Sequence, residues 1–336
     1  MDSSTGRKPF PMKAGLEMDV ALVDPGSIEP HLEWSEVVDA IRSGHALPRA
    51  SIADNLVQRG RDGLLLRSAW IDGLGSVVKC ATVFPGNDDR GIPTIHGSVT
   101  LFDDRTGVPE AFLDFHQVTR WKTAADSLLG AQLLARKDSR SVLIIGAGTV
   151  ARSLVPAYAS RFQGIRFMVW NRTIARAEGM KAECSPLADI EVVTNIEAAA
   201  GEADIICCAT MSAKPVLSGR WLKPGQHLDL IGSFRPDTRE VDDDAILRSS
   251  LFVNSLETAL GKAGEIIIPL ETGVITRDRI LGDLYDLVAG RIGRTSREEI
   301  TLYKNGGGAH LDLMTARHLL DKWTSVRRNA GARDDN

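Results

Sequence analysis

A glycine-rich turn that follows an apolar run is the clearest chemical signal in the sequence. The run Val142-Leu143-Ile144-Ile145 continues into Gly146-Ala147-Gly148-Thr149-Val150-Ala151, which has the pattern Gly-x-Gly-x-x-Ala. Where a strand leads through such a turn into a helix, Gly146 permits the tight turn, Gly148 lets backbone approach a pyrophosphate and Ala151 allows close packing. The helix N-terminus then offers N–H groups to the anion. We therefore assign dinucleotide binding to Gly146, Ala147, Gly148, Thr149 and Val150.

The end of the next apolar run indicates which dinucleotide is expected. NAD-binding enzymes carry an acidic residue there, which holds the ribose 2′-hydroxyl. Here Met168-Val169-Trp170 is followed by Asn171-Arg172-Thr173, without a carboxylate. An amide, a guanidinium and a hydroxyl together suit a 2′-phosphate. Arg172 could be only a solvated loop charge, but its position where the carboxylate is missing favours NADP(H) over NAD(H).

A lysine inside an apolar segment points to a second site. Lys79 stands in the run Val77-Val78-Lys79-Cys80-Ala81. A buried ammonium is unfavourable unless an anion pairs with it. Lys79 is therefore predicted to have an anionic partner rather than to be a solvated charge in a strand.

Two kinds of scaffold are needed to position these residues. From Ser141 onward, short apolar runs alternate with polar or Ala-rich segments, which indicates a parallel sheet with helices on both faces. The expected strands are 141–145, 165–170, 190–194, 204–209, 227–231, 251–253 and 299–304, and a final helix is expected over 311–323.

The preceding part of the chain has shorter apolar runs separated by turn residues, which predict a mostly antiparallel sheet. The expected strands are 21–23, 64–66, 77–84, 95–102 and 111–115. One helix is expected from Trp34, and the Ala- and Leu-rich segment 119–136 is expected to be a connecting helix. The predicted fold class is α/β, with a Rossmann-type doubly wound parallel sheet plus an α+β part. Residues 1 to about 17 are left outside the predicted fold.

Length and composition support a globular protein of two domains. The chain has 336 residues, of which 43% are hydrophobic and 25% charged, and its formal charge is -4. Without a basic excess, nucleic acid is not an expected partner. No apolar stretch approaches the roughly 18 to 20 residues of a membrane span, so no membrane contact and a cytoplasmic location are expected. The four cysteines, Cys80, Cys184, Cys207 and Cys208, lack CxxC spacing and are expected to be reduced and buried.

The sequence resembles the ornithine cyclodeaminase and mu-crystallin family over nearly all of the predicted fold. The resemblance rests on a combination of segments, namely 78–79, 84–87, 91–94, 122–125, the Gly146 fingerprint with 171–173, and 300–308. It implies a substrate-binding and dimerisation domain over 18–130 and a Rossmann NADP-binding domain over 131–308. A C-terminal helix, 309–330, should return to the first domain. A homodimer is expected, because the first sheet is too small and strand-rich to cover both of its faces alone.

The resemblance also implies a basic pocket that holds the carboxylate of a small amino or imino acid beside the nicotinamide. Arg49, Lys79, Lys122 and Thr94 match the pocket positions. Most relatives carry Arg where this chain has Lys122, and a lysine keeps the charge but loses the bidentate fork. Four residues at two further strand ends are assigned to the cofactor, namely Ala209, Thr210, Gly232 and Ser233. Lys304 or Asn305 is expected toward the nicotinamide. His96 and His310, the latter with Asp312 two residues on, could face the pocket or have an ordinary structural role.

Residue 234 separates the possible reactions. In ornithine cyclodeaminases the position that matches Phe234 is Asp, which resembles a general base for the substrate amine, and Phe cannot transfer a proton. The loop with Arg235 and Asp237 resembles that of cyclic imino acid (ketimine) reductases, whose substrates already carry a C=N bond. We therefore expect an NADP(H)-dependent reductase of Δ1-pyrroline-2-carboxylate or Δ1-piperideine-2-carboxylate, which would yield proline or pipecolate.

Other functions stay open at this point. The first alternative is an NAD-dependent ornithine cyclodeaminase, and the others are an opine-type or alanine dehydrogenase and a non-catalytic ligand-binding protein. No metal site is expected. Asp242-Asp243-Asp244 precedes Ala245-Ile246-Leu247 and indicates an acidic helix start, and the histidines lack ligand spacing.

Overall fold

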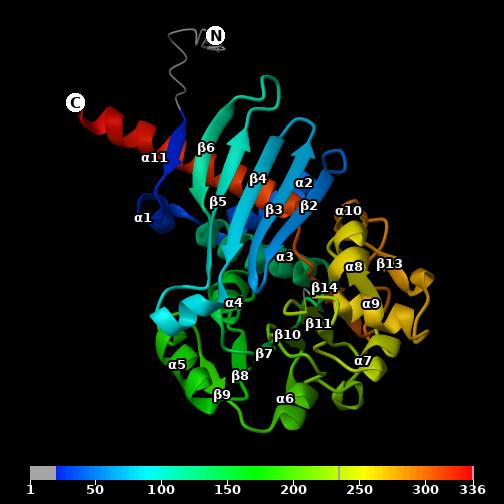
Figure 1. Ribbon diagram of the computed structural model, residues 1–336. Helices are drawn as coiled ribbons and strands as arrows, with labels where there is room; N and C mark the ends of the chain where they lie inside the picture. The colour runs from blue at the N-terminus through cyan, green and yellow to red at the C-terminus, as the bar shows by residue number, and fades with distance from the viewer. Residues whose placement is uncertain (1–19, 234, 335–336) are drawn as a thin grey trace, which may run out of the picture.

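Two β-sheets carry the fold in the computed structural model, which describes residues 20–233 and 235–334. A six-stranded sheet is formed by the first part of the chain and an eight-stranded sheet by the remainder (Figure 1). Among the residues described, no helix is both long enough and apolar enough to span a bilayer.

The six-stranded sheet has the order β1-β6-β5-β4-β3-β2. Its strands are β1 (Ala21–Val23), β2 (Ser51–Arg59), β3 (Asp62–Ile71), β4 (Gly75–Val83), β5 (Ile95–Phe102) and β6 (Pro109–Asp114). Neighbours pair antiparallel, except that β1 runs parallel to β6. The mostly antiparallel prediction is confirmed. The edge strand β2 was not predicted, because most of its residues are exposed and its sequence has no apolar run.

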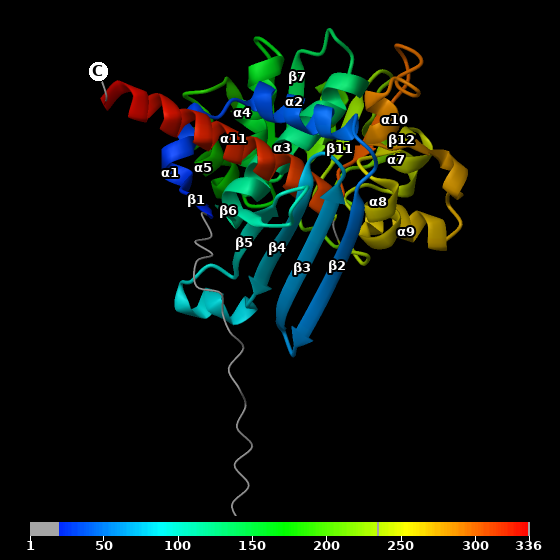
Figure 2. The same cartoon turned by 90° about the horizontal axis from the view of Figure 1, so that it is seen from above.

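Helices cover only one face of this sheet. α2 (Trp34–His45), α3 (Phe115–Leu134) and α11 (Ala309–Asp334) lie on that face, while the short α1 (Pro25–Ile28) lies beside the N-terminal strand (Figure 2). Strand alternation explains the division. Val77 and Leu101 face each other across β4 and β5 and are fully buried, whereas their neighbours in sequence, such as Val78, are exposed.

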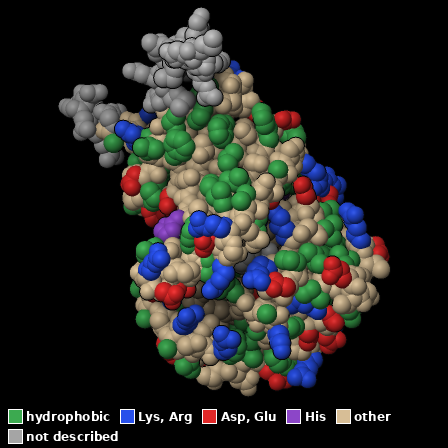
Figure 3. All heavy atoms as spheres, in the orientation of Figure 1, with side chains coloured by type: hydrophobic (Ala, Val, Ile, Leu, Met, Phe, Trp, Pro, Cys, Tyr) green, Lys and Arg blue, Asp and Glu red, His purple; other side chains and the backbone are tan. Residues whose placement is uncertain are grey.

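The uncovered face of the six-stranded sheet is apolar. Leu22, Phe112 and Val78 lie in one cross-strand row and are 72%, 42% and 38% exposed. Trp70 stands opposite Ser76 on the same face and is 50% exposed. Figure 3 shows hydrophobic side chains gathered on the upper part of the molecule, over this sheet. Contiguous exposed apolar patches are uncommon on monomeric proteins.

The eight-stranded sheet is parallel throughout, with the order β13-β12-β14-β11-β10-β7-β8-β9. Its strands are β7 (Ser141–Ile145), β8 (Arg166–Trp170), β9 (Ile190–Val192), β10 (Ile205–Cys208), β11 (His227–Leu230), β12 (Ser250–Val253), β13 (Ile280–Gly282) and β14 (Thr301–Lys304). Its helices are α4 (Thr149–Arg161), α5 (Ile174–Cys184), α6 (Ile196–Glu202), α7 (Asp243–Leu247), α8 (Leu256–Lys262), α9 (Gly264–Glu271) and α10 (Leu284–Val288). The short strand β13 was not predicted.

Both faces of the parallel sheet are buried. In β7, Val142 and Ile144 pack into the core shared with α3 and α4, whereas Leu143 and Ile145 pack into a second core with α6 and α7. The α/β class and the doubly wound sheet are therefore confirmed. Cys207 and Cys208, in the central strand β10, are buried and free, as is Cys184, while Cys80 in β4 is only partly buried. The predicted burial is confirmed for these three cysteines and is wrong for Cys80.

The helix ends differ from those predicted for physical reasons. The connecting helix α3 begins at Phe115 rather than at residue 119, because the Asp114 side chain caps it by accepting from Gln117 N at 2.7 Å. The final helix extends from Ala309 to Asp334, beyond both the predicted core 311–323 and its outer limits 309–330. The domain limits themselves remain a prediction.

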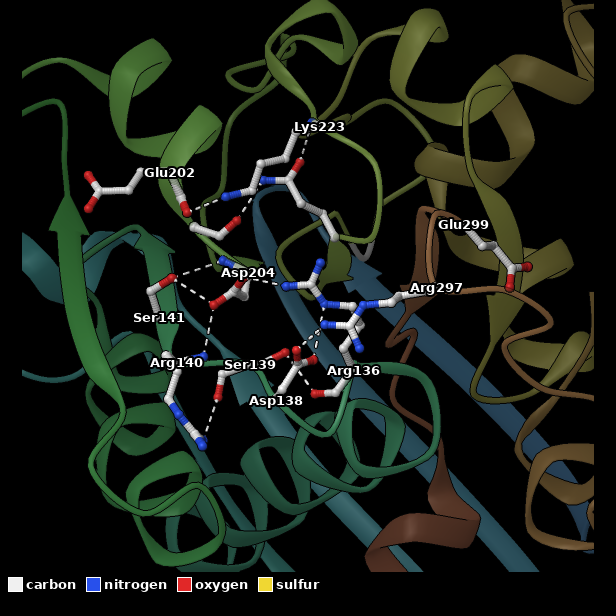
Figure 4. A network of polar contacts seen from close by, with 12 residues as sticks. Arg136, Asp138, Ser139, Arg140, Ser141, Glu202, Asp204, Lys223, Arg297 and Glu299 are labelled. Atoms are coloured by element: carbon white, nitrogen blue, oxygen red, sulfur yellow. Dashed lines mark hydrogen bonds and ion pairs between the residues drawn. The ribbon is translucent and has the colours of Figure 1, made fainter.

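A polar network fixes the segment between α3 and β7 (Figure 4). Asp204, just before β10, accepts from Arg136 at 2.8 Å and from Arg140 N at 2.8 Å, and Ser141 also contacts it. Asp138 pairs with Arg297. This network lies at the amino ends of the central strands, opposite the edge where the Gly146 turn begins, so it is structural and not part of the cofactor site.

Candidate functional site

Two lysines meet at one carboxylate on the helix-covered face of the six-stranded sheet. Lys79 Nζ in β4 donates to Asp312 Oδ1 at 2.9 Å, and Lys122 Nζ in α3 lies 2.6 Å from the same oxygen. Lys79 and Lys122 are 5% and 3% exposed, and Asp312, in the first turn of α11, is fully buried. The predicted anionic partner of Lys79 is thus confirmed and is Asp312.

Each ammonium keeps a free donor. Lys79 also donates to Thr119 Oγ1 at 2.7 Å, and Lys122 donates to Gly308 O at 3.2 Å. An ammonium has three N–H donors, so each lysine has one left for a further acceptor. Burial lowers the pKa of Lys122 to about 7, with Asp312 opposing the shift and Lys79 adding to it. The charges of Lys122 and Lys79 hold the pKa of Asp312 below its usual value against the effect of burial.

Buried polar atoms without partners surround this cluster. Within the described part of the chain, Asp312 Oδ2, both ring nitrogens of His310 and Nε2 of His45 make no hydrogen bond. The rings of His45 and His310 are 5.5 Å apart. Burial lowers the pKa of His45 to about 4 and that of His310 well below its usual value, so both imidazoles are neutral near pH 7. Unsatisfied buried groups of this kind are expected where a polar ligand binds.

Arg49 lies apart from the lysines in this structure. Its guanidinium binds Asp283 in a bidentate pair of 2.6 and 3.0 Å and lies 4.4 Å above the Tyr285 ring. Asp283 caps α10, so this pair joins the segment before β2 to the parallel-sheet half. The Arg49 side chain is 54% exposed. The structure therefore brings Lys79 and Lys122 together but does not place Arg49 in contact with either.

Thr94 and His96 are more peripheral. Thr94 lies just before β5, where its carbonyl accepts from Phe84 N at 2.7 Å, and it makes no hydrogen bond to Lys79 or Lys122. His96 is exposed. The sequence alone assigns no site role to Arg67. In the structure it stands opposite Lys79 on β3 and pairs with Asp54 at 3.2 Å. Asp54 also pairs with Lys262 of α8, which adds a second contact between the two halves.

The glycine-rich turn has the geometry expected of a phosphate cradle. Gly146 has φ +122°, and a Cβ there would lie 2.6 Å from Ala209 O, so only glycine fits. Gly148 is the N-cap of α4, has no side-chain cap, and has open space where a Cβ would stand. The first N–H groups of an α-helix lack intrahelical partners. This open helix start fits a pyrophosphate.

The residues after β8 are available to a ligand. Asn171 donates to Thr173 O at 2.8 Å, and Arg172 and Thr173 are exposed. Arg172 makes no ion pair with any residue that the structure describes. Arg152, one turn into α4, was not singled out; it contacts Ala147 O and pairs with Glu183 at 2.7 Å.

The ends of β10 and β11 complete this edge of the sheet. A Cβ on Gly232 would lie 1.7 Å from Thr210 O, which shows how closely the two strand ends approach. Ser233 is buried and contacts Thr238. Phe234 lies outside the described residues. Arg235 and Asp237 pair with each other at 2.6 Å and are exposed.

The last residue of strand β14 and the residue after it are buried beneath this edge. Lys304 donates to Leu230 O at 3.0 Å, and Asn305 donates to Thr123 O and Ser127 Oγ at 3.1 and 3.0 Å. These contacts give both residues internal partners in the protein. Asp242 caps α7 by accepting from Ala245 N, as the acidic helix start predicted. Among the residues described, no group of three or more His, Cys, Asp or Glu side chains could hold a metal ion.

Comparison with known proteins relates this architecture to one family. The model of the ornithine cyclodeaminase/mu-crystallin family matches residues 70–327. A Δ1-pyrroline-2-carboxylate reductase from Paracoccus denitrificans is 49% identical over 297 residues, which cover 88% of this chain and 94% of that protein.

Solved structures agree with this relationship. A Thermococcus litoralis Δ1-pyrroline-2-carboxylate reductase in complex with NADH and L-proline has a TM-score of 0.83 at 29% identity, over 90% of this chain and 97% of the other. An archaeal alanine dehydrogenase dimer with bound NAD has a TM-score of 0.84 at 26% identity, over 91% of this chain and 96% of the other.

Proposed function

The chain belongs to the ornithine cyclodeaminase/mu-crystallin family, and on that basis we propose that it is an NADP(H)-dependent reductase of small cyclic imino acids. The substrates would be Δ1-pyrroline-2-carboxylate or Δ1-piperideine-2-carboxylate. The names of a relative at 49% identity and of a solved structure that holds proline support this choice of substrate class.

The observation that carries the proposal is the pair of buried lysines on Asp312. Each lysine has one donor left, and when both lysines are protonated the three charged groups sum to one positive charge, which one substrate carboxylate would balance. Burial makes these donors strong, because water does not compete for them. Arg49, released from Asp283, is the third basic residue assigned to the carboxylate, and Thr94 lines the pocket.

The reduced nicotinamide cofactor would supply a hydride to the carbon of the protonated C=N bond, which would give a secondary amine and the oxidised cofactor. The protein's part is to hold the substrate carboxylate at Lys79 and Lys122 and to orient the ring toward the cofactor. Residue 234 is phenylalanine, so the chain carries no carboxylate at the position that serves cyclodeaminases as a base. A preformed imine has no ammonium to deprotonate, so a reductase that acts on it does not need this base.

The cofactor is assigned to the carboxyl edge of the parallel sheet. Its pyrophosphate would bind at Gly146, Ala147, Gly148, Thr149 and Val150, and its nicotinamide half beside Ala209, Thr210, Gly232 and Ser233. Asn171, Arg172 and Thr173 would hold the 2′-phosphate, which supports NADPH as the preferred donor. The two solved structures named above hold NADH and NAD, and a direct comparison of NADPH with NADH tests this preference.

A homodimer through the apolar face of the six-stranded sheet is part of the proposal. The exposed side chains of Leu22, Phe112, Val78 and Trp70 support it. The archaeal relative named as a dimer supports it as well. The division into a substrate and dimerisation domain over 18–130 and a Rossmann domain over 131–308 follows the two sheets.

One assay tests the reaction. NADPH oxidation would be followed with each of the two cyclic imines, while ammonia and proline formation from ornithine are measured in parallel with NAD. We expect oxidation of NADPH with at least one imine and negligible ammonia from ornithine. Ammonia release without imine reduction would show a cyclodeaminase, and binding of NADPH without either reaction would favour a non-catalytic ligand-binding protein.

A further inference from the structure

A buried glutamate joins the ends of two neighbouring strands of the parallel sheet. Glu240 is fully buried, and its Oε1 accepts from Thr210 N at 2.7 Å and from Thr210 Oγ1 at 2.8 Å. Its Oε2 accepts from Gly232 N at 2.7 Å. One carboxylate therefore satisfies three donors, which come from the loops after β10 and β11.

The backbone of Glu240 is bound by a second buried glutamate. Glu265 of α9, also fully buried, accepts from Glu240 N at 2.8 Å and from Val241 N at 3.1 Å. The buried Lys304 ammonium lies close enough to Glu240 and Glu265 for its charge to be stabilised by both. Glu265 thus fixes the backbone of Glu240, and Lys304 supplies a positive charge near its carboxylate.

The position of these loops in the sheet gives the contact a function. In a doubly wound sheet the dinucleotide crosses the point where the strand order reverses, with one mononucleotide half on each side. Here β7 is flanked by β8 on one side and by β10 and then β11 on the other. Because Asn171-Arg172-Thr173 follow β8, the adenine half belongs on that side and the nicotinamide half on the side of β10 and β11.

We propose that Glu240 is a positioning residue for the nicotinamide half of the cofactor, because it ties the Thr210 and Gly232 loops into one rigid wall. The inference rests on the proposed dinucleotide site and deepens it. The carboxylate acts as an acceptor for all three donors, a role that a neutral amide with one oxygen cannot fill completely. Two loops fixed in this way before the ligand arrives lose little freedom on binding, which strengthens affinity.

The first test measures hydrogen exchange in the wild-type protein without cofactor. The amides of Thr210 and Gly232 should exchange as slowly as those of the adjoining strand β10, although both belong to loops. Exchange of these two amides at the rate of free loops would overturn the proposal, and this result requires no variant to fold.

The second test compares Glu240→Gln with Glu271→Gln, a matched change of an exposed residue at the end of α9. Affinity for NADPH and for adenosine 2′,5′-bisphosphate, which represents the adenine half alone, would be measured by titration, with Tm as the measure of folding. We expect Glu240→Gln to bind NADPH about tenfold more weakly than the wild type and to bind the bisphosphate equally well. In this variant the amides of Thr210 and Gly232 should exchange hydrogen faster than in the wild type. Glu271→Gln should change neither affinity.

The outcomes separate this inference from the proposed function. If the wild type binds neither NADPH nor NADH, the dinucleotide site is wrong, whatever Glu240 does. If the wild type binds NADPH and Glu240→Gln binds it equally well, or loses both ligands equally, Glu240 does not position the nicotinamide half.

Discussion

Lys79 and Lys122 share one oxygen atom, Asp312 Oδ1, although one lysine stands on a strand of the six-stranded sheet and the other on the helix that leads to the parallel sheet. The carboxylate keeps two buried ammonium groups within reach of each other, which their mutual repulsion would otherwise oppose. The remaining positive charge is what an anionic substrate would meet.

Replacement of either lysine should affect substrate use more than cofactor binding. Lys79→Ala and Lys122→Ala each remove a charge-assisted contact to the substrate carboxylate, so kcat/KM for the imino acid should fall at least about tenfold. Lys79 should matter more, because Lys122, with a pKa of about 7, is only partly charged near neutral pH. NADPH affinity by titration should stay near the wild-type value, and the exposed Lys137→Ala serves as the control. A variant with poor NADPH binding but a normal substrate KM would show that the lysine has been misassigned.

Substrate affinity should depend on pH through Lys122. Its pKa of about 7 in the unliganded protein means that the ammonium is charged below pH 7 and loses its proton as the pH rises through that value. The KM for the imino acid should therefore increase between about pH 6.5 and 8.5. Lys122→Arg keeps its charge throughout this range. Ionisation of the substrate affects both proteins equally, so the difference between their pH profiles reports on Lys122 alone. An identical pH profile for the two proteins would rule out Lys122 as the cause.

Cofactor choice should follow the residues after β8. We expect NADPH to exceed NADH by at least about tenfold in kcat/KM, since a charge-assisted contact to phosphate contributes roughly 1.5 to 3 kcal/mol. Arg172→Ala should lower the value for NADPH and leave that for NADH unchanged, with Arg161→Ala at the far end of α4 as the control. Equal use of both cofactors by the wild type would contradict the assignment.

Ornithine should be a very poor substrate. Loss of a general base typically reduces a rate by about 10² to 10⁴, so cyclodeamination should be undetectable beside imine reduction. Ammonia release from ornithine, measured with NAD, is the direct test. A Phe234→Asp variant should recover at most a trace, because the neighbouring Arg235 would compete for the new carboxylate. Robust ammonia release by the wild type would instead point to another base, with Asp237 the first to examine.

The apolar sheet face should be an interface between two copies of the chain. Light scattering at micromolar concentration should give twice the chain mass of 36.4 kDa. Phe112→Asp, at the centre of the cross-strand row, should shift the protein toward the monomer, while Asp189→Asn, at an exposed position just before β9 of the other sheet, should not. A wild-type mass near that of one chain would refute the dimer.

The parallel half of the fold could be predicted well because its strands are buried on both faces and appear as continuous apolar runs. The strands that escaped prediction, β2 and β13, are an exposed edge strand and a strand of three residues, neither of which has such a run. Helix α3 began earlier than expected because a single cap, Asp114, decides where it starts.

Sequence reasoning recognised Lys79 as a buried charge but did not identify its partner. Asp312 comes from α11, at the opposite end of the chain, and only the return of that helix to the first sheet brings the two together. A usable signal was present, since Asp312 stands among Leu311, Leu313 and Met314, where an unpaired carboxylate would be unfavourable. The pair Arg49–Asp283 and the contacts of Glu240 had no such signal, because they depend on how loops from separate strands approach.

The placement of the cysteines gives each sheet its own chemical reporter. Cys207 and Cys208 are buried in the central strand of the parallel sheet, where burial raises the pKa of both thiols, while Cys80 is partly accessible on the six-stranded sheet. A thiol reagent can reach the first two only when strand β10 separates from its neighbours. The rate of alkylation at Cys207 and Cys208 would therefore time the opening of the parallel sheet, whereas Cys80 reacts without such an opening, and a bound cofactor should slow only the reaction at Cys207 and Cys208.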